Sequence, residues 1–373
     1  MSQEPATYDA SHITVLHGLE AVRKRPGMYI GSTGERGLHL LVIEAAGWGF
    51  DEILHRRASR LDVTLLSDGG VRLADDGPGV AFGTGPSLTV ALTVLTAGWR
   101  AIGPRYPMSS VLGQVSVVNA LSSRLVAEVR REGRRHVQEF VRGVPVAPVA
   151  DSGPTSGSGT AVTFWADADI FEVTEFSFET LVERFRELVF LNRELDISLT
   201  DERGQAEPRT VRLHHPDGVR ELVAFLDEEG GGVEIVGFEA EEPQTETTME
   251  IAWRWRGSGP ERVHGFANSQ PTPEGGTHLL GFRDGMAAAL TGYARERQLL
   301  ASTDPDIDPG RIGRGLTAVV SVKVKYPQFD GCTWGALGNA EVRGYVRQAV
   351  QHHLGGWLTA NPQQATEILD RLR

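Results

Sequence analysis

Cysteine, lysine and long apolar runs are all scarce in this chain of 373 residues. The single cysteine, Cys332, cannot form an internal disulfide, and no charged segment followed by an apolar stretch opens the sequence, so we expect a reducing cytoplasmic location. No apolar run approaches the ~20 residues that a membrane-spanning helix needs, which predicts no membrane partner. Lysine is nearly absent beside abundant arginine, and this bias marks no single patch because it runs through the whole chain.

The formal net charge of -12 argues against a surface built throughout to bind DNA phosphates, although a local arginine stripe stays open. The length and the 40% hydrophobic content are enough for two cores. Turn sequences around 201–204 and 215–218 place the boundary near 212–218. We therefore expect one domain over residues 1–214 and a second over residues 215–373.

Hydrophobic periodicity predicts an α+β fold in both halves. In the first, Ser11 can cap a helix that stops at Arg25-Pro26-Gly27, and a second helix begins near Gly37. Alternating residues around the turn at 67–70 predict a hairpin. Further helices are expected near 88–95 and 115–121, and strands near 125–129, 136–141 and 160–165. The second half repeats this mixture, with helices near 219–226, after 276 and over 339–358, and strands near 248–255, 262–269 and 316–324.

Several motifs together carry a resemblance to a known family. The N-terminal motif runs from Tyr8 to Leu16 and from Gly18-Leu19-Glu20-Ala21-Val22-Arg23-Lys24-Arg25-Pro26-Gly27 to Gly31. Others are Ser116-Val117-Val118-Asn119-Ala120-Leu121-Ser122, Gly159-Thr160, Gly275-Gly276-Thr277-His278, Gly315-Leu316-Thr317-Ala318 and Leu337-Gly338-Asn339-Ala340-Glu341. This pattern resembles the B subunits of DNA gyrase and topoisomerase IV over nearly the entire chain.

The resemblance implies a GHKL-type ATPase sandwich, with an antiparallel or mixed sheet covered by helices on one side. A transducer domain with a βαβ crossover is expected to follow it. The family hydrolyses ATP and dimerises when ATP binds. In a complete topoisomerase a metal-binding cleavage domain comes next, and this chain stops before any such region, so we expect that it cannot cut DNA alone.

Four residues match functional positions of the family. Glu44 matches the general base that activates water, and the alternative is an ordinary helix-surface glutamate. Asp75 matches the aspartate that binds the adenine amino group, although an Asp-Asp-Gly turn would explain it equally well. Gly79 matches the glycine that approaches the base closely. Thr160 matches a threonine that helps to hold adenine, or is a simple β-branched strand residue.

Other positions depart from the family. Trp48 replaces the asparagine that binds magnesium, and an indole has no oxygen to offer a hard cation, so we expect no metal site and interpret the ring as core packing. Pro78 replaces an arginine that braces the pocket. In the phosphate lid the family's Leu-His-Gly-Val-Gly reads Ser110-Val111-Leu112-Gly113-Gln114, so Val111, Leu112 and Gln114 would obstruct backbone contact with phosphates.

Five further positions concern phosphate sensing and assembly. Arg100 is either the replacement for the lid lysine or a solvated loop arginine. Cys332 and Trp334 stand in the loop where the family's Gln-Thr-Lys touches the terminal phosphate, and tryptophan carries no charge for that contact. Tyr8 and Ile13 match the arm that reaches across the family's dimer, which predicts a homodimer through this arm, or a tyrosine that packs its own domain.

Three hypotheses for function stay open. The chain is a divergent ATP-hydrolysing subunit, a non-catalytic pseudo-ATPase that acts as a dimerising interaction module for gyrase subunits or DNA, or a decoy for gyrase inhibitors. The cofactors that the resemblance implies are ATP, which we expect to bind weakly, and Mg²⁺, whose ligand Trp48 replaces. The substitutions predict impaired ATP hydrolysis, whichever hypothesis holds.

Overall fold

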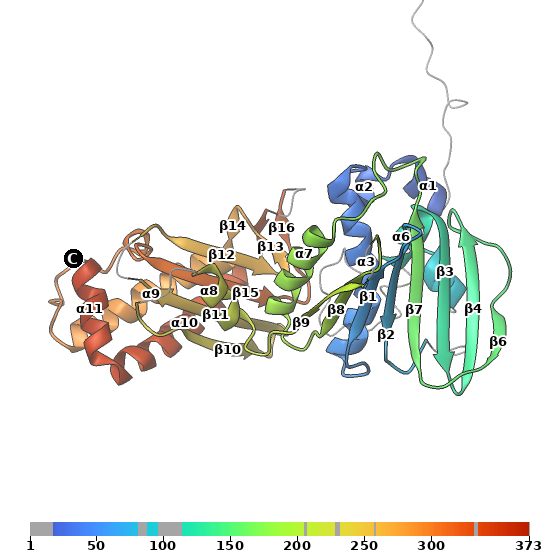
Figure 1. Cartoon of the computed structure of the whole chain (residues 1–373). Coiled ribbons are helices and arrows are strands. Elements are labelled where there is room, and N and C mark those ends of the chain that lie inside the picture. The colour runs from blue at the N-terminus through green and yellow to red at the C-terminus, as the bar shows by residue number, and fades with distance from the viewer. Residues whose placement is uncertain are drawn as a thin grey trace, which may run out of the picture. The chain divides into compact units, whose positions relative to one another are not determined.

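The computed structural model describes residues 18–80, 88–95, 114–204, 207–227, 232–256, 259–331 and 335–372 (Figure 1). Its contacts divide the chain into two compact units. Within the described ranges, the first unit takes residues up to 182 together with 197–212, and the second takes 183–196 and the residues from 213 onward. Each unit is described by itself.

The first unit is built on a sheet of nine strands. These are β1 (Leu61–Leu65), β2 (Val71–Asp75), β3 (Ser122–Arg131), β4 (Arg134–Val141), β5 (Val144–Pro145), β6 (Ala150–Pro154), β7 (Gly159–Ala166), β8 (Ile197–Asp201) and β9 (Arg209–Leu213). Their order is β5-β4-β3-β7-β2-β1-β8-β9, with β6 paired to β4. Because β1 pairs in parallel with β8 and antiparallel with β2, the sheet is mixed.

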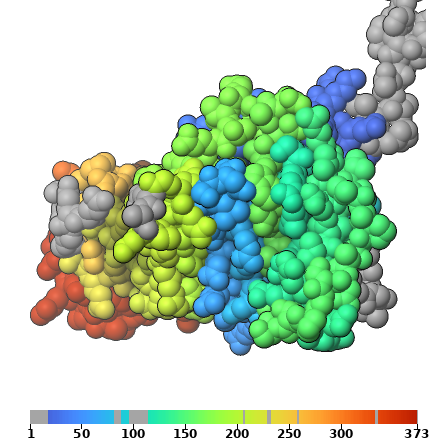
Figure 2. Space-filling view, turned by 45° about the vertical axis from the view of Figure 1, so that its right-hand side comes forward, coloured from blue at the N-terminus to red at the C-terminus, as the bar shows by residue number. Residues whose placement is uncertain are grey.

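Helices cover one face of this sheet. They include α1 (Leu19–Lys24), α2 (Gly27–Ile30), α3 (Glu35–Leu54), α4 (Leu88–Thr93) and α6 (Val115–Ala120). Along β1, Leu61, Val63 and Leu65 are buried while Asp62 and Thr64 are half-buried, as expected of a strand with one face on a core. Figure 2 looks onto the other face, where the β1–β2 hairpin in light blue lies beside green and teal strands. The predicted one-sided α+β sandwich is confirmed.

The second unit contains a five-stranded sheet, a small three-stranded sheet and long helices. The larger sheet has the order β10 (Val236–Glu242), β11 (Thr247–Trp255), β15 (Leu316–Lys323), β12 (Arg262–Ala267) and β13 (Gln270–Pro271). The smaller joins β14 (Gly275–Gly276), β17 (Ala336–Leu337) and β16 (Phe329–Asp330). The helices are α8 (Val219–Leu226), α9 (Thr277–Glu296), α10 (Ala340–Ala360) and α11 (Pro362–Leu372), with a short 3₁₀ turn at Pro309–Arg311.

The predicted crossover is confirmed in this second unit. Strand β12 pairs in parallel with β15, and the chain between them passes through α9. The core beneath the sheet includes Trp253, Phe282 and Leu290, all buried. No described helix of either unit is long and apolar enough to cross a membrane.

The structure also contains elements that the sequence analysis did not predict. The short helix α2 follows directly after the predicted stop at Arg25-Pro26-Gly27, with Pro26 at its N-cap. Helix α7 (Phe178–Leu191), the strands β8, β9 and β10, and the terminal helix α11 are further additions. The part of the first predicted helix before residue 18 lies outside the described residues, and α1 ends at Lys24.

Candidate functional site

The Asp75 carboxyl group ends strand β2 and is held by backbone amides. Its Oδ1 accepts hydrogen bonds from the Gly77 N–H at 2.9 Å and from the Thr160 N–H at 3.3 Å. Asp75 and Thr160 are both 4% exposed. Burial raises the pKa of Asp75 to about 6, against the lowering effect of the two amides, and the nearby negative charge of Glu52 raises it further. Within the described residues Oδ2 makes no hydrogen bond, so one lobe of this carboxylate can accept a donor from outside.

Two glycines allow the backbone to close around this carboxylate. A Cβ on Gly159, whose φ is +139°, would lie 2.2 Å from the Asp75 carbonyl oxygen. A Cβ on Gly79, whose φ is +75°, would lie 2.6 Å from the Arg130 carbonyl oxygen. Gly79 is thus a point of close approach, and its described neighbour is strand β3.

Glu44 lies in the middle of α3 and is 2% exposed. Its Oε2 accepts a hydrogen bond of 3.0 Å from the backbone N–H of Gln114. Gln114 is the N-cap residue of α6. A carboxylate at the amino end of a helix is favoured by the unpaired N–H groups and the partial positive charge there. The structure therefore places Glu44 beside Gln114, two residues predicted from different motifs.

Trp48 follows Glu44 by one turn of α3 and is 9% exposed. Its burial agrees with the interpretation of the ring as packing. Among the described residues no group of three or more His, Cys, Asp and Glu side chains is arranged to hold a metal ion. An indole adds an N–H donor and no oxygen, so the donor set next to Glu44 does not fit Mg²⁺.

Arginines near Pro78 come from elsewhere in the sequence, and the sequence analysis missed them. Arg131 Nη1 donates a hydrogen bond of 2.9 Å to the Gly79 carbonyl oxygen. Arg57 binds Glu52 through Nε at 2.8 Å and Nη2 at 3.0 Å, and Asp51 through Nη2 at 2.9 Å. Burial raises the pKa of Asp51 to about 6, partly offset by His55 and Arg57.

Seven sequence-predicted residues lie outside the described part of the chain. They are Tyr8, Ile13, Arg100, Val111, Leu112, Cys332 and Trp334. Their predicted roles stay predictions.

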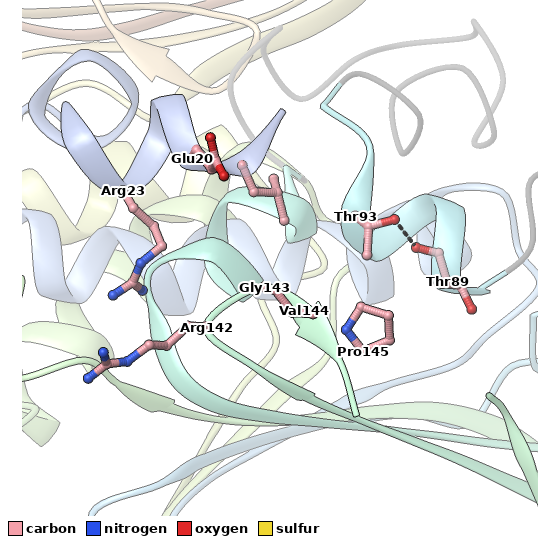
Figure 3. Close-up of a pocket in the computed structure, with 9 residues that line it drawn as sticks. Glu20, Arg23, Thr89, Thr93, Arg142, Gly143, Val144 and Pro145 are labelled. Atoms are coloured by element: carbon pink, nitrogen blue, oxygen red, sulfur yellow. Dashed lines mark hydrogen bonds between the residues drawn. The ribbon is translucent and has the colours of Figure 1, made fainter. Parts of the chain in front are cut away.

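A separate pocket of about 320 Å³ opens between α1, α4 and the β4–β5 turn (Figure 3). Thr89 and Thr93 line one side, and Gly143, Val144 and Pro145 line another. In Figure 3 the guanidinium groups of Arg23 and Arg142 lie on the side away from the threonines. Both arginines contact Asp167, at 2.7 Å and 3.2 Å, so their charges are already paired. None of the predicted site residues that the structure describes lines this pocket.

Comparison with known proteins gives the family. A family model described as DNA gyrase B matches residues 218–373. The crystal structure of the 43K ATPase domain of Thermus thermophilus gyrase B in complex with an aminocoumarin matches with a TM-score of 0.81 and 31% identity, over 95% of this chain and 93% of that one. The chain belongs to the DNA gyrase B family.

Other gyrase B proteins agree with this assignment. The DNA gyrase B protein of Streptomyces coelicolor is 46% identical over 98% of this chain, and the novobiocin-resistant DNA gyrase B protein of Streptomyces niveus is 45% identical over 98%. The chain spans 57% of the length of each of these two relatives. The ATP-binding domain of Francisella tularensis topoisomerase IV, in complex with a small-molecule inhibitor, matches with a TM-score of 0.78 at 27% identity, over 96% of both chains.

Proposed function

We propose that this gyrase B family member is a nucleotide-site module in which Asp75 holds the adenine end of a ligand, with weak or absent ATP turnover. Residues 1–214 would form the ATPase-type domain and residues 215–373 the transducer-type domain. Asp75 and Thr160 supply the recognition site, Gly79 lies in the adjoining loop, and Glu44 occupies the position of the general base. The alternative is a divergent subunit that hydrolyses ATP.

The observation that carries this proposal is the buried indole of Trp48 one helical turn from Glu44. A magnesium ion that would neutralise charge on the phosphates needs oxygen ligands, and the Trp48 side chain offers none. The carboxylate at the position of the general base also has a hydrogen-bond partner already, since Glu44 accepts a hydrogen bond from the Gln114 N–H. Gln114 and Trp334 further replace family residues that contact phosphate.

Magnitudes support weak turnover. Each lost electrostatic contact of this kind typically removes roughly 2–4 kcal/mol of transition-state stabilisation. A partial sum over the metal ligand, the lid glycines and the sensor lysine would lower the rate by several powers of ten, because ~1.4 kcal/mol corresponds to a factor of ten.

A steady-state phosphate-release assay tests this proposal. We expect no magnesium-dependent ATP hydrolysis above background in the purified chain. Glu44→Ala should leave the background unchanged, as should Glu35→Ala, which alters an exposed glutamate on the same helix. Magnesium-dependent turnover that disappears in Glu44→Ala but persists in Glu35→Ala would show that Glu44 is a working general base and that the proposal is wrong.

A decoy for gyrase inhibitors is the second candidate. It is favoured by the intact Asp75–Thr160 cradle beside a position that does not fit a metal, because a ligand recognised through a donor group alone needs no magnesium. The related Thermus structure holds an aminocoumarin, and the Streptomyces niveus relative is named novobiocin-resistant. Calorimetry with ATP, ADP and an aminocoumarin, with and without Mg²⁺, separates the candidates. Nucleotide binding without turnover supports the first, and aminocoumarin binding alone supports the second.

Partners and location complete the proposal. The N-terminal arm with Tyr8 and Ile13 would mediate a homodimer in the cytoplasm, and the Arg100 side chain would meet ligand phosphate. Gyrase subunits and DNA are the candidate partners. Sedimentation of the full chain against a variant with Tyr8→Ala and Ile13→Ala tests the dimer, and a pull-down with purified gyrase subunits tests the partner.

A further inference from the structure

We propose that Arg57 is a positioning residue of the Asp75 site, which acts by holding Glu52 against Gly77 and by neutralising the carboxylates of Asp51 and Glu52. This inference rests on the proposed function, because it assigns to Asp75 a ligand that donates a hydrogen bond. It concerns the loop at 75–79, where position 78 is a proline and provides no charge.

The backbone directs Arg57 toward Glu52. Helix α3 ends at Leu54, and Arg56 takes a left-handed conformation with φ of +57°. The N–H groups of Arg57 and Ala58 then donate to the Glu52 carbonyl oxygen at 2.8 and 3.1 Å. The turn therefore brings the guanidinium group back over the last turn of the helix.

The contact between the Arg57 guanidinium and the Glu52 carboxylate is bidentate. Nε reaches Oε2 and Nη2 reaches Oε1, while Nη2 also reaches Asp51 Oδ2. Paired N–H donors on a carboxylate fix its orientation better than a single charge does. The side chains of Glu52 and Asp51 are each 18% exposed, against 40% for Arg57, so the two carboxylates lie deeper than the guanidinium that pairs with them.

Glu52 in turn lies against the Asp75 loop. A Cβ placed on Gly77 would be 3.4 Å from Glu52 Oε2 and 2.9 Å from Asp75 Oδ1, so Gly77 lies between the two carboxylates. The Gly77 N–H donates to Asp75. A displaced Glu52 would therefore disturb the segment that supplies one of the two amide donors to Asp75.

Charge leads to the same conclusion. The charged groups that act on the Asp75 carboxylate are Glu52 from α3 and Asp76 from its own loop, and both are negative. Arg130 from β3 lies beside the neighbouring backbone, with Nη2 3.5 Å from a Cβ placed on Gly159. Asp76 is tied to the Ser59 and Arg60 N–H groups. Without Arg57, the negative charge of Glu52 loses its partner and Asp75 holds its proton more strongly. A protonated Asp75 could no longer act as a charged acceptor.

Nuclear magnetic resonance titration of the full chain with carbon-13 aspartate tests this inference without a ligand. The Asp75 signal is the one missing from Asp75→Asn. In Arg57→Ala we expect the pKa of Asp75 to rise by about 0.5 or more, since charges at short range typically shift pKa values by about one unit or more. The matched control is Arg60→Ala, which removes an exposed guanidinium whose ion-pair partner in the described structure is Asp62, at 3.4 Å, and which should leave the Asp75 titration unchanged.

Binding gives the second measurement. With ADP and with an aminocoumarin as probes, Arg57→Ala should weaken binding about 3–10-fold at pH 7, mostly because Glu52 and Gly77 lose their fixed positions, and should move the midpoint of the pH dependence of binding upward. Arg57→Lys keeps the charge but not the bidentate geometry, so it should keep the wild-type midpoint with intermediate affinity. Arg57→Lys also keeps the inference testable if Arg57→Ala does not fold. A folded Arg57→Lys with wild-type affinity for both probes would refute a positioning role.

An unchanged Asp75 pKa and midpoint in a folded Arg57→Ala would overturn the inference. A failure of the proposed function would give a different set of results. In that case the wild-type chain binds neither probe, while the resonance titration still decides whether Arg57 controls Asp75.

Discussion

At the scale of single residues, the geometry of the proposed site depends on how closely the backbone approaches Asp75. Gly159 shows this dependence, since any side chain there would meet the Asp75 carbonyl oxygen at 2.2 Å. We expect Gly159→Ala to destabilise the chain by about 1–3 kcal/mol and to abolish binding of an Asp75-dependent ligand, because a methyl group must force β2 and β7 apart. Urea unfolding and calorimetry would measure the two effects.

Gly157 is the matched control for that substitution. It also has a positive φ, +77°, but nothing lies within 4 Å of its Cβ position. Gly157→Ala should therefore carry only the backbone strain of the left-handed region, about 1 kcal/mol, and keep ligand binding. Equal loss of binding in both variants would mean that contact with Asp75 is not what requires a glycine at 159.

The polar and charged residues around this site were only partly predictable. Asp75, Thr160 and Glu44 were identified through motifs, and the structure buries all three. Arg131 and the Arg57–Glu52 pair were missed because their partners are set by the turn after α3 and by the pairing of β3. The available signal was a cluster of charged residues at 51–57, in the last turn of α3 and directly after it.

At the scale of elements, α9 and α10 approach closely because α9 presents glycines one turn apart. Cβ atoms on Gly281 and Gly285 would lie 2.5 and 2.6 Å from the carbonyl oxygens of Arg343 and Arg347. We expect Gly285→Ala to lower the free energy of unfolding by about 1–3 kcal/mol, since the helices must separate. Gly292→Ala, on the same helix with open space at its Cβ, should instead raise it by about 0.5–1 kcal/mol. Thermal or urea unfolding distinguishes the two signs.

Periodicity predicted most of the elements and failed where pairing is non-local. The hairpin, β11, β15, α9 and α10 lie close to the predicted ranges because each has a strong local pattern. Strand β8 is held by parallel pairing with β1, which is far away in the sequence, and no local signal indicates such a partner. Helix α7 did carry a signal, since Phe178, Leu181 and Phe185 are all buried at helical spacing, and that pattern was overlooked.

At the scale of the whole molecule, buried ionisable groups make stability depend on pH in opposite directions. Asp51 and Asp75 each have a folded pKa of about 6, above the ordinary pKa of 3.8. Between these values the folded state binds more protons than the unfolded state, so both groups lower stability as pH rises through this window. His278 acts in the opposite sense, because burial lowers its pKa from 6.5 to about 4.

His278 gives the sharpest test of this balance. Its Nε2 lies 3.1 Å from Thr272 Oγ1, and its buried Nδ1 has no hydrogen-bond partner among the described residues. The unfolded state takes up a proton near pH 6.5 and the folded state resists it down to about 4, so stability falls as pH decreases through this window, by up to about 3 kcal/mol. His278→Gln cannot charge and can still bond to the Thr272 hydroxyl.

Urea unfolding between pH 4.5 and 7.5 measures the difference between these variants. Lowering the pH should destabilise the wild-type chain more than His278→Gln, and the gap between them should close toward pH 7.5. His352→Gln, at an exposed histidine of α10, should follow the wild-type curve. If His278→Gln loses as much stability in acid as the wild type, then protonation of other groups governs the loss of stability at low pH. The cost of charging the buried His278 imidazole would then not be its cause.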